Sequence, residues 1–241
     1  MEDQRVKARL EEGFAAMGVC CDGAALGKLL RFHALLMEWN ARIDLTAVLD
    51  PVEMADRHYL DSAAPLAKGL IPQGARVVDV GTGAGFPGVP LAILRPDLHV
   101  TLLDALRKRV DFLQAVIDEL GLSATAVHMR AEDAGRSPGF REAYDLAVSR
   151  AVAATPVLLE LMLPLLKVGG SAIAWKGPGV QEELAQGKRA AHLLGGEIGG
   201  VLEAPVPGRD WQHVLLVCGK KQKTARQYPR RAGTPGKNPL G

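Results

Sequence analysis

Apolar residues follow a helical spacing in the first part of the chain and a strand-like spacing further on. From the N-terminus to about residue 70 the spacing is helical. Val6, Leu10 and Phe14 fall on one face of a first predicted helix, and a second helix begins near residue 24. Asp50-Pro51 predicts the start of a third helix, because proline is favoured in the first turn. We therefore expect residues 1–70 to form an N-terminal helical extension.

Between residues 71 and 219, short apolar runs alternate with helical stretches. Predicted strands occupy residues 77–80, 98–104, 124–129, 144–150, 168–175, 197–203 and 212–218. This alternation predicts an α/β fold with a doubly wound, mostly parallel seven-stranded sheet. The last two strands have no clear helix between them, which favours a closing antiparallel hairpin. That arrangement is typical of the S-adenosylmethionine-dependent (class I) methyltransferases rather than of dehydrogenases.

The first predicted strand runs into the glycine-rich loop Gly81-Thr82-Gly83-Ala84-Gly85-Phe86-Pro87-Gly88. A strand, a glycine loop and a helix in this order bind nucleotide-like cofactors at the carboxyl edge of α/β sheets. Asp79 stands inside the strand, where a carboxylate would repel phosphates and attract a cation. This favours S-adenosylmethionine, which carries a sulfonium and an ammonium, over a dinucleotide. Asp79 can also hold the loop amides, and the two roles are compatible.

A second carboxylate, Asp104, ends the next predicted strand about 20 residues after the loop, the usual position of a ribose partner. It can equally cap the helix that follows. Arg107, Lys108 and Arg109 open that helix, although cations at a helix N-terminus oppose the macrodipole. These cations therefore fit contact with a partner, or simple solvation, better than helix stability.

Composition describes an ordinary globular chain of 241 residues, 48% apolar, with a mean hydropathy of +0.06. No apolar run approaches the ~20 residues of a membrane span. The charged start Met1-Glu2-Asp3-Gln4-Arg5 does not resemble a signal peptide. Three cysteines without metal spacing suit a reducing compartment. We expect a cytoplasmic protein with no metal site and no structural disulfide.

Charge is distributed unevenly. From Trp211 onward the chain has seven basic residues and no acidic ones, so the remainder is net negative. Residues 220–241 are also rich in proline and glycine and lack periodicity, which predicts a flexible basic C-terminal arm. A basic arm on an acidic body favours contact with a polyanion such as nucleic acid, and a solubilising tail is the alternative.

Several motifs together resemble the ribosomal RNA small subunit methyltransferase G family, also called glucose-inhibited division protein B. They cover nearly the whole chain in order: Trp39-Asn40 through Leu45-Thr46, Arg57 through Ser62, the glycine loop with Asp79, Leu103-Asp104 with Lys108-Arg109, Ser149-Arg150-Ala151, and Arg230 through Lys237. The chain departs from the family at Asp44, where Asn is usual, and at Ala105, where Ser is usual.

The resemblance implies methyl transfer from S-adenosylmethionine to N7 of a guanine in 16S ribosomal RNA near the decoding centre. The partner would be that RNA within the small ribosomal subunit or its precursor, and the protein a monomer without a metal. Guanine N7 has an in-plane lone pair and no proton, so no catalytic proton-transfer residue is expected. Catalysis can then rest on alignment of the reacting atoms. A nicotinamide-dependent oxidoreductase with the same loop, or a non-catalytic RNA-binding protein that retains the fold, remain as alternatives.

The resemblance also implies which residues form the site. It implies cofactor contacts at Gly81, Gly83, Phe86, Asp104, Ala105, Leu106, Ala131, Glu132 and Arg150, and Asp79 is a further candidate because of its charge in the strand before the loop. Candidates for RNA contact are Arg57, His58, Arg107, Lys108, Arg109, Lys176, Lys220, Lys221, Arg230, Arg231 and Lys237. Arg57, His58 and Asp61 either line the site or pin the helical extension, and the sequence does not separate these roles.

Overall fold

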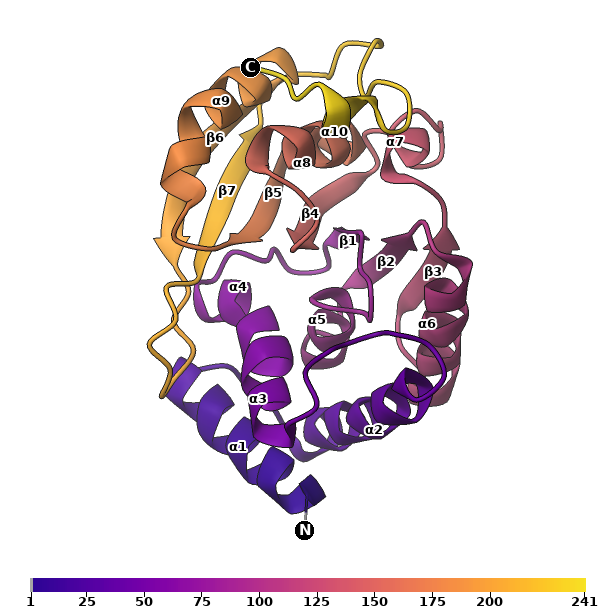
Figure 1. Ribbon diagram of the computed structural model, residues 1–241, viewed down its shortest axis with the longest axis vertical. Helices are drawn as coiled ribbons and strands as arrows, with labels where there is room; N and C mark the ends of the chain where they lie inside the picture. Colours follow the sequence, from indigo (N-terminus) through magenta and orange to yellow (C-terminus); the bar gives the residue numbers. More distant parts are fainter. Residues whose placement is uncertain (1) are drawn as a thin grey trace.

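A seven-stranded sheet crosses the middle of the molecule in the computed structural model, which describes residues 2–241 (Figure 1). Met1, the first residue of the charged N-terminal segment, lies outside the described residues. The strands are β1 (Arg76–Val80), β2 (His99–Asp104), β3 (Ala124–His128), β4 (Tyr144–Arg150), β5 (Leu166–Lys176), β6 (Gly196–Glu203) and β7 (Val214–Lys220). Their order is β3-β2-β1-β4-β5-β7-β6, with β7 antiparallel to both neighbours and the β1–β5 pairs parallel. The predicted α/β sheet and its antiparallel closing strand are confirmed.

One face of the sheet is covered by the N-terminal helices together with two helices of the sheet domain. These are α1 (Glu2–Met17), α2 (Gly23–Asn40), α3 (Pro51–Met54), the π-helical turn η1 (Ala55–Leu60), α4 (Ala64–Ala67), α5 (Gly88–Leu94) and α6 (Arg107–Leu120). Asp50 caps α3 by accepting from the Glu53 amide at 2.8 Å, and Pro51 occupies its first turn as predicted. A single core, from Val6 to Leu215, joins these helices to the sheet.

Phe32 of α2 lies at the centre of that core and is fully buried. Its ring packs against Tyr59 of η1, Phe86 of the glycine loop and Phe112 of α6, with ring centroids 5.2 to 6.3 Å apart. One aromatic side chain of the extension therefore contacts the glycine loop directly. The N-terminal helices are consequently part of the support of the candidate site.

The other face of the sheet carries α7 (Ala131–Ala134), α8 (Thr155–Met162), the 3₁₀ turn η2 (Leu163–Leu165) and α9 (Val180–Leu193). Strand periodicity assigns alternate residues to the two faces, so Val77 points into the first core and Val78 into the second. Among the helices that the structure describes, none combines the length and apolar character needed to cross a membrane.

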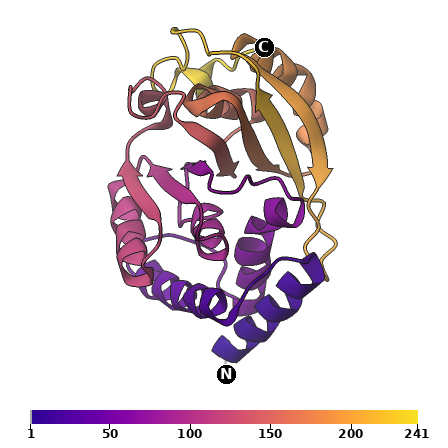
Figure 2. The same ribbon diagram turned by 180° about the vertical axis from the view of Figure 1, so that it is seen from behind.

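Residues 220–241 form an ordered segment, which we call the C-terminal strap, so the prediction of a flexible arm is wrong. The strap contains α10 (Thr234–Lys237) and lies at the opposite end of the molecule from the N-terminus (Figure 1, Figure 2). Lys220 is 1% exposed and donates from Nζ to the carbonyl oxygens of Leu163 and Leu194 and to the Thr224 hydroxyl. Burial lowers the pKa of Lys220 to about 8. Two of its cations, Lys220 and Arg230, find carbonyl and carboxylate partners within the protein and hold the segment in place.

Replacing Phe32 with alanine tests the aromatic link between the extension and the loop. We expect Phe32→Ala to lower the free energy of unfolding by about 3–5 kcal/mol, because the cavity would adjoin three packed elements. Leu49→Ala, at a side chain that is 62% exposed, is the control and should change it by less than about 0.5 kcal/mol. Chemical denaturation of both variants measures the difference. Equal stabilities would contradict the central role of Phe32.

Candidate cofactor and substrate site

The glycine loop leaves β1 with a backbone that only glycine adopts readily. Gly81, Gly83 and Gly85 have φ angles of 71°, 61° and 94°, in the left-handed region. The amides of Gly81 and Thr82 donate to the carbonyl oxygen of Leu103 at 2.9 and 3.1 Å, which ties the loop to the end of β2. A Cβ atom built on Gly83 would meet no atom within 4 Å. The loop is therefore rigid and has open space above Gly83 for a ligand.

Asp79 lies completely buried beneath this loop. Its Oδ2 accepts from the Thr82 hydroxyl at 2.7 Å and from the Gly88 amide at 2.8 Å, whereas Oδ1 has no partner. Burial raises the pKa of Asp79 to about 7. The hydrogen bonds establish the loop-holding role. The unpaired Oδ1 is a second acceptor beneath the loop.

Asp104, at the end of β2, connects the glycine loop to the start of α6. Its Oδ2 accepts from the Gly83 amide at 3.0 Å and its Oδ1 from the Leu106 amide at 2.8 Å, and Arg109 lies 3.6 Å from Oδ2. The carboxylate therefore ties the glycine loop to the residue before α6, whereas the alternative role of a helix cap is wrong, because Leu106 is the N-cap of α6 and the helix has no side-chain cap. A carboxylate offers about four acceptor positions, so Asp104 keeps capacity for hydroxyl groups of a ligand.

A cavity of about 170 Å³ opens beside Asp104 and reaches α7. Residues at and after the ends of β1, β2 and β3, with one residue after β4 and one on α8, line it: Val80, Gly81, Leu103, Asp104, Ala105, Met129, Arg130, Ala131, Glu132, Val152 and Leu161. Glu132 is buried, and its Oε1 accepts from the amide of Gly233 in the strap at 2.8 Å. Its Oε2 lies 3.7 Å from Arg130. The structure thus brings Asp104 and Ala105, at the end of β2, into one cavity with Ala131 and Glu132, which follow β3.

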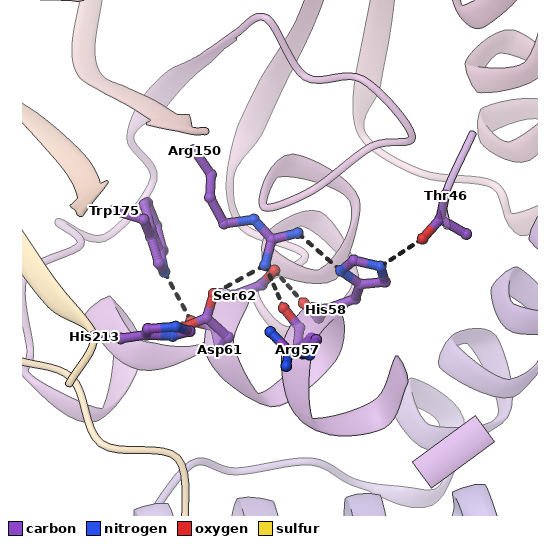
Figure 3. Close-up of polar contacts among 8 residues, drawn as sticks. All are labelled: Thr46, Arg57, His58, Asp61, Ser62, Arg150, Trp175 and His213. Carbon is purple, nitrogen blue, oxygen red and sulfur yellow. Dashed lines mark hydrogen bonds and ion pairs between the residues drawn. The ribbon is translucent and has the colours of Figure 1, made fainter. Parts of the chain in front are cut away.

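Arg150, at the end of β4, holds the helical extension over the sheet edge (Figure 3). Its guanidinium donates to the carbonyl oxygen of Arg57, to Asp61 Oδ2 at 2.9 Å and to His58 Nδ1 at 3.2 Å. It also lies 5.5 Å from the centroid of the Phe86 ring. The other oxygen of Asp61 contacts His213 Nδ1 at 3.0 Å. Arg150 therefore links the extension, the glycine loop and, through Asp61, the segment before β7.

His58 is held as a neutral ring by these contacts. A guanidinium can only donate, so Nδ1 accepts from Arg150 and Nε2 carries the proton that is donated to Thr46 Oγ1 at 2.9 Å. Burial, and then the charge of Arg150, lower the pKa of His58 to about 4. The ring stacks on Phe86 with centroids 4.7 Å apart. Asn40 fixes Thr46 through three hydrogen bonds to residues 45 and 46.

The expected RNA-contact residues separate into internal and exposed groups. Of the candidates for RNA contact, His58, Lys176, Lys220 and Arg230 make contacts inside the protein. Lys176, for example, pairs with Glu183 at 2.7 Å and donates to the carbonyl oxygen of Ala153. Arg57 and Arg107 form surface pairs with Glu53 and Asp111. Lys108, Lys221, Arg231 and Lys237 are exposed, and the half-buried Arg109 contacts Asp104.

Sequence reasoning missed the aromatic and basic group on the loop before β7. Trp211 lies between Arg57 and Arg209, whose guanidinium carbons are 4.5 and 5.2 Å from the ring centroid. His213 on the same loop contacts Asp61. No spacing in the sequence indicates the contacts of Trp211 with Arg57 and of His213 with Asp61, because the partners are about 150 residues apart. Asn40 and Thr46 belong to a family motif for which the sequence predicted no role, and in the structure they support His58.

Comparison with known proteins gives one consistent family. Residues 25–204 match the family model described as rRNA small subunit methyltransferase G. The chain is 45% identical over 246 residues to the ribosomal RNA small subunit methyltransferase G of Symbiobacterium thermophilum, with 100% of both chains covered. It is 43% identical over 236 residues to the protein of the same name from Alkaliphilus oremlandii, covering 98% of this chain and 99% of that one.

Solved structures show a similar fold at low sequence identity. A TehB-like SAM-dependent methyltransferase from Corynebacterium glutamicum superposes with a TM-score of 0.50 at 19% identity, covering 79% of this chain and 98% of that one. The branched-chain polyamine synthase from Thermus thermophilus, solved with 5'-methylthioadenosine, gives a TM-score of 0.59 at 17% identity, with 83% and 65% covered. These similarities concern the fold alone.

Replacing Asp104 tests the cavity as a nucleoside site. We expect Asp104→Ala to weaken binding of S-adenosylhomocysteine by roughly 1–3 kcal/mol, because ligand hydroxyls would lose a charged acceptor. Calorimetric titration measures the affinity. Asp111→Ala, at an exposed carboxylate on the helix that follows β2, is the matched control. Unchanged affinity in Asp104→Ala would leave Asp104 with only its role of tying the loop to the start of α6.

The raised pKa of Asp79 predicts a pH-dependent stability. Its folded-state pKa of about 7 lies above the ordinary value of 3.8, so between these values the native state holds a proton that the unfolded state has lost. The contribution of Asp79 is thus complete below the ordinary value and is lost as the pH rises through about 7. Relative to Asp79→Asn, native stability should fall by up to ~1.4 kcal/mol per pH unit and then level off above about pH 7. Urea denaturation across this range gives the difference curve, and a flat curve would contradict the shift.

Proposed function

Because the chain belongs to the rRNA small subunit methyltransferase G family, we propose that it methylates N7 of a guanine in 16S ribosomal RNA near the decoding centre. The protein is an S-adenosylmethionine-dependent 16S rRNA methyltransferase. The choice of N7 is our proposal. The observation that carries it concerns His58, whose ring is neutral and has both nitrogens in hydrogen bonds to Arg150 and Thr46. This histidine beside the loop therefore cannot serve as a base, and methylation at N7 needs none.

The cofactor fits the residues around the glycine loop. We propose that Asp104 accepts from the ribose hydroxyls with its remaining acceptor capacity, and that Ala131 and Glu132 contact the adenine. Gly81 and Gly83 provide close backbone approach, and Ala105 and Leu106 flank the ribose. The unpaired Asp79 Oδ1 adds negative potential beneath the loop when the carboxyl is ionised, which favours a cationic ligand.

Bound S-adenosylmethionine supplies an electrophilic methyl group on sulfur. Transfer to guanine N7 forms one nitrogen–carbon bond and breaks one sulfur–carbon bond, and no proton leaves the base. The protein therefore has to orient the guanine rather than ionise it, and orientation alone contributes up to ~7–11 kcal/mol in favourable cases. We propose that the stacked rings of Phe86 and His58, fixed by Arg150, form the rigid wall against which the guanine is placed.

The RNA partner is supported by the family and by the exposed cations. We propose that the cations near the cofactor edge of the sheet contact RNA phosphates: Arg57, Arg107, Lys108 and Arg109. Phosphate contacts of this kind position the RNA without reading its sequence. We further propose that a monomeric, metal-independent enzyme acts on the small subunit or its precursor in the cytoplasm. In this scheme residues 1–70 support the substrate side and residues 71–219 bind the cofactor.

Two rival functions have less support. A nicotinamide oxidoreductase would use the same loop, but Asp79 beneath it disfavours a pyrophosphate. A non-catalytic RNA-binding protein would not need the intact Asp79, Asp104 and open Gly83 together.

The position of methylation distinguishes N7 from other atoms of guanine. Purified protein, S-adenosylmethionine and either naked 16S RNA or small subunits that lack the modification are incubated, and the RNA is mapped by mass spectrometry. We expect one added methyl on one guanine and strand cleavage there after reduction and aniline treatment, to which N7-methylguanine is susceptible. Gly83→Val, which fills the open space above the loop, should abolish transfer. A methyl group on N1 or N2 would contradict the proposal.

A further inference from the structure

The C-terminal strap contacts the short helix that completes the cofactor cavity. The Gly233 amide donates to Glu132 Oε1 at 2.8 Å, and Arg136 Nε donates to the carbonyl oxygen of Pro229 at 2.7 Å. At Gly135 a Cβ atom would lie 2.8 Å from the Pro229 ring. The strap therefore contacts α7 at Glu132 and the two residues that follow the helix, Gly135 and Arg136.

A buried ion pair anchors the strap independently of α7. Glu160 on α8 is fully buried, and the Arg230 guanidinium binds both of its oxygens, with Nη2 at 2.6 Å from Oε2 and Nε at 2.9 Å from Oε1. The Arg230 backbone amide also donates to Oε1 at 2.8 Å. Arg141 adds hydrogen bonds to the carbonyl oxygens of Thr224 and Tyr228. A carboxylate buried this deeply needs such partners, so Arg230 fixes where the strap lies.

We infer that the C-terminal strap is a positioning element of the cofactor pocket, with Arg230 as its anchor and the Gly233 amide as its contact to Glu132. The amide holds Oε1, whereas Oε2, which lies 3.7 Å from Arg130 Nε, keeps acceptor capacity for the cofactor. This inference rests on the proposed assignment of the cavity to S-adenosylmethionine. It replaces the role that charge alone suggests, in which the segment binds RNA and leaves cofactor binding unaffected.

The strap and the cofactor would both contact the carboxylate of Glu132, so docking of the strap and binding of the cofactor affect each other reciprocally. If the docked strap increases affinity for the cofactor, the bound cofactor increases strap docking by the same factor. Hydrogen exchange at residues 226–241 should therefore slow when S-adenosylhomocysteine is bound. A strap that contacts only RNA would show no such change.

The first test compares two adjacent arginines of the full-length chain. Arg230→Ala removes the anchor, whereas Arg231→Ala changes an exposed cation and is the matched control. We expect Arg230→Ala to raise the dissociation constant of S-adenosylhomocysteine and the KM for S-adenosylmethionine by about fivefold or more, the range of ordinary couplings. The KM for RNA should be unchanged, and Arg231→Ala should retain native cofactor affinity.

Two further variants guard against a folding effect. Arg230→Ala leaves Glu160 buried without its partner, so Arg230→Met combined with Glu160→Gln removes the unpaired charge while the anchor stays absent. Gly135→Ala displaces the strap at Pro229 while every residue of the strap and of the ion pair stays native. Each should keep a single native melting transition and still show the weakened cofactor binding.

Native affinity for S-adenosylhomocysteine in Arg230→Ala and in Gly135→Ala would overturn the inference. A raised KM for RNA with unchanged cofactor affinity would also overturn it and assign the strap to RNA. Failure of the native protein itself to bind S-adenosylhomocysteine would instead contradict the proposed function.

Discussion

The guanidinium of Arg150 joins the two parts of the molecule that make the site. From the end of β4 it donates hydrogen bonds to the segment between Arg57 and Asp61. The acceptors are a backbone carbonyl oxygen, a carboxylate and a ring nitrogen. Without it, the buried carboxylate of Asp61 would keep only His213 as a side-chain partner. The helical extension and the sheet therefore form one structural unit at the sheet edge, and neither can move without disturbing the wall beside the glycine loop.

Burial shifts the pKa values of two titratable groups near the glycine loop in opposite directions. It lowers the pKa of His58 and raises the pKa of Asp79, so it favours the neutral form of both. The surroundings of the loop are consequently poor in charge before a ligand arrives. In such a medium the attraction between a sulfonium and the remaining carboxylates is stronger than it would be in water.

The parts of the fold that sequence could predict are those set by local pattern. Strand periodicity located the sheet, and glycine spacing located the loop, because the left-handed φ angles at Gly81, Gly83 and Gly85 require glycine. Asp104 was predictable because parallel strands end at the same edge. The partners of Arg230 and Lys220 were not, because Glu160 and the Leu163 carbonyl lie dozens of residues away and carry no periodic signal. The cation-rich composition therefore predicted a flexible arm that contacts a polyanion, whereas the fold supplies internal partners for Lys220 and Arg230.

The sequence separation of Arg230 and Glu160 has a consequence for biosynthesis. Glu160 is translated 70 residues earlier than Arg230, so a nascent chain that has already packed α8 against the sheet carries a buried carboxylate with no counter-ion. Native packing around α8 can be completed only after Arg230 has left the ribosome. A frameshift or premature stop codon upstream of Arg230 would therefore leave Glu160 unpaired and produce an unstable protein, which protein quality control would be expected to remove.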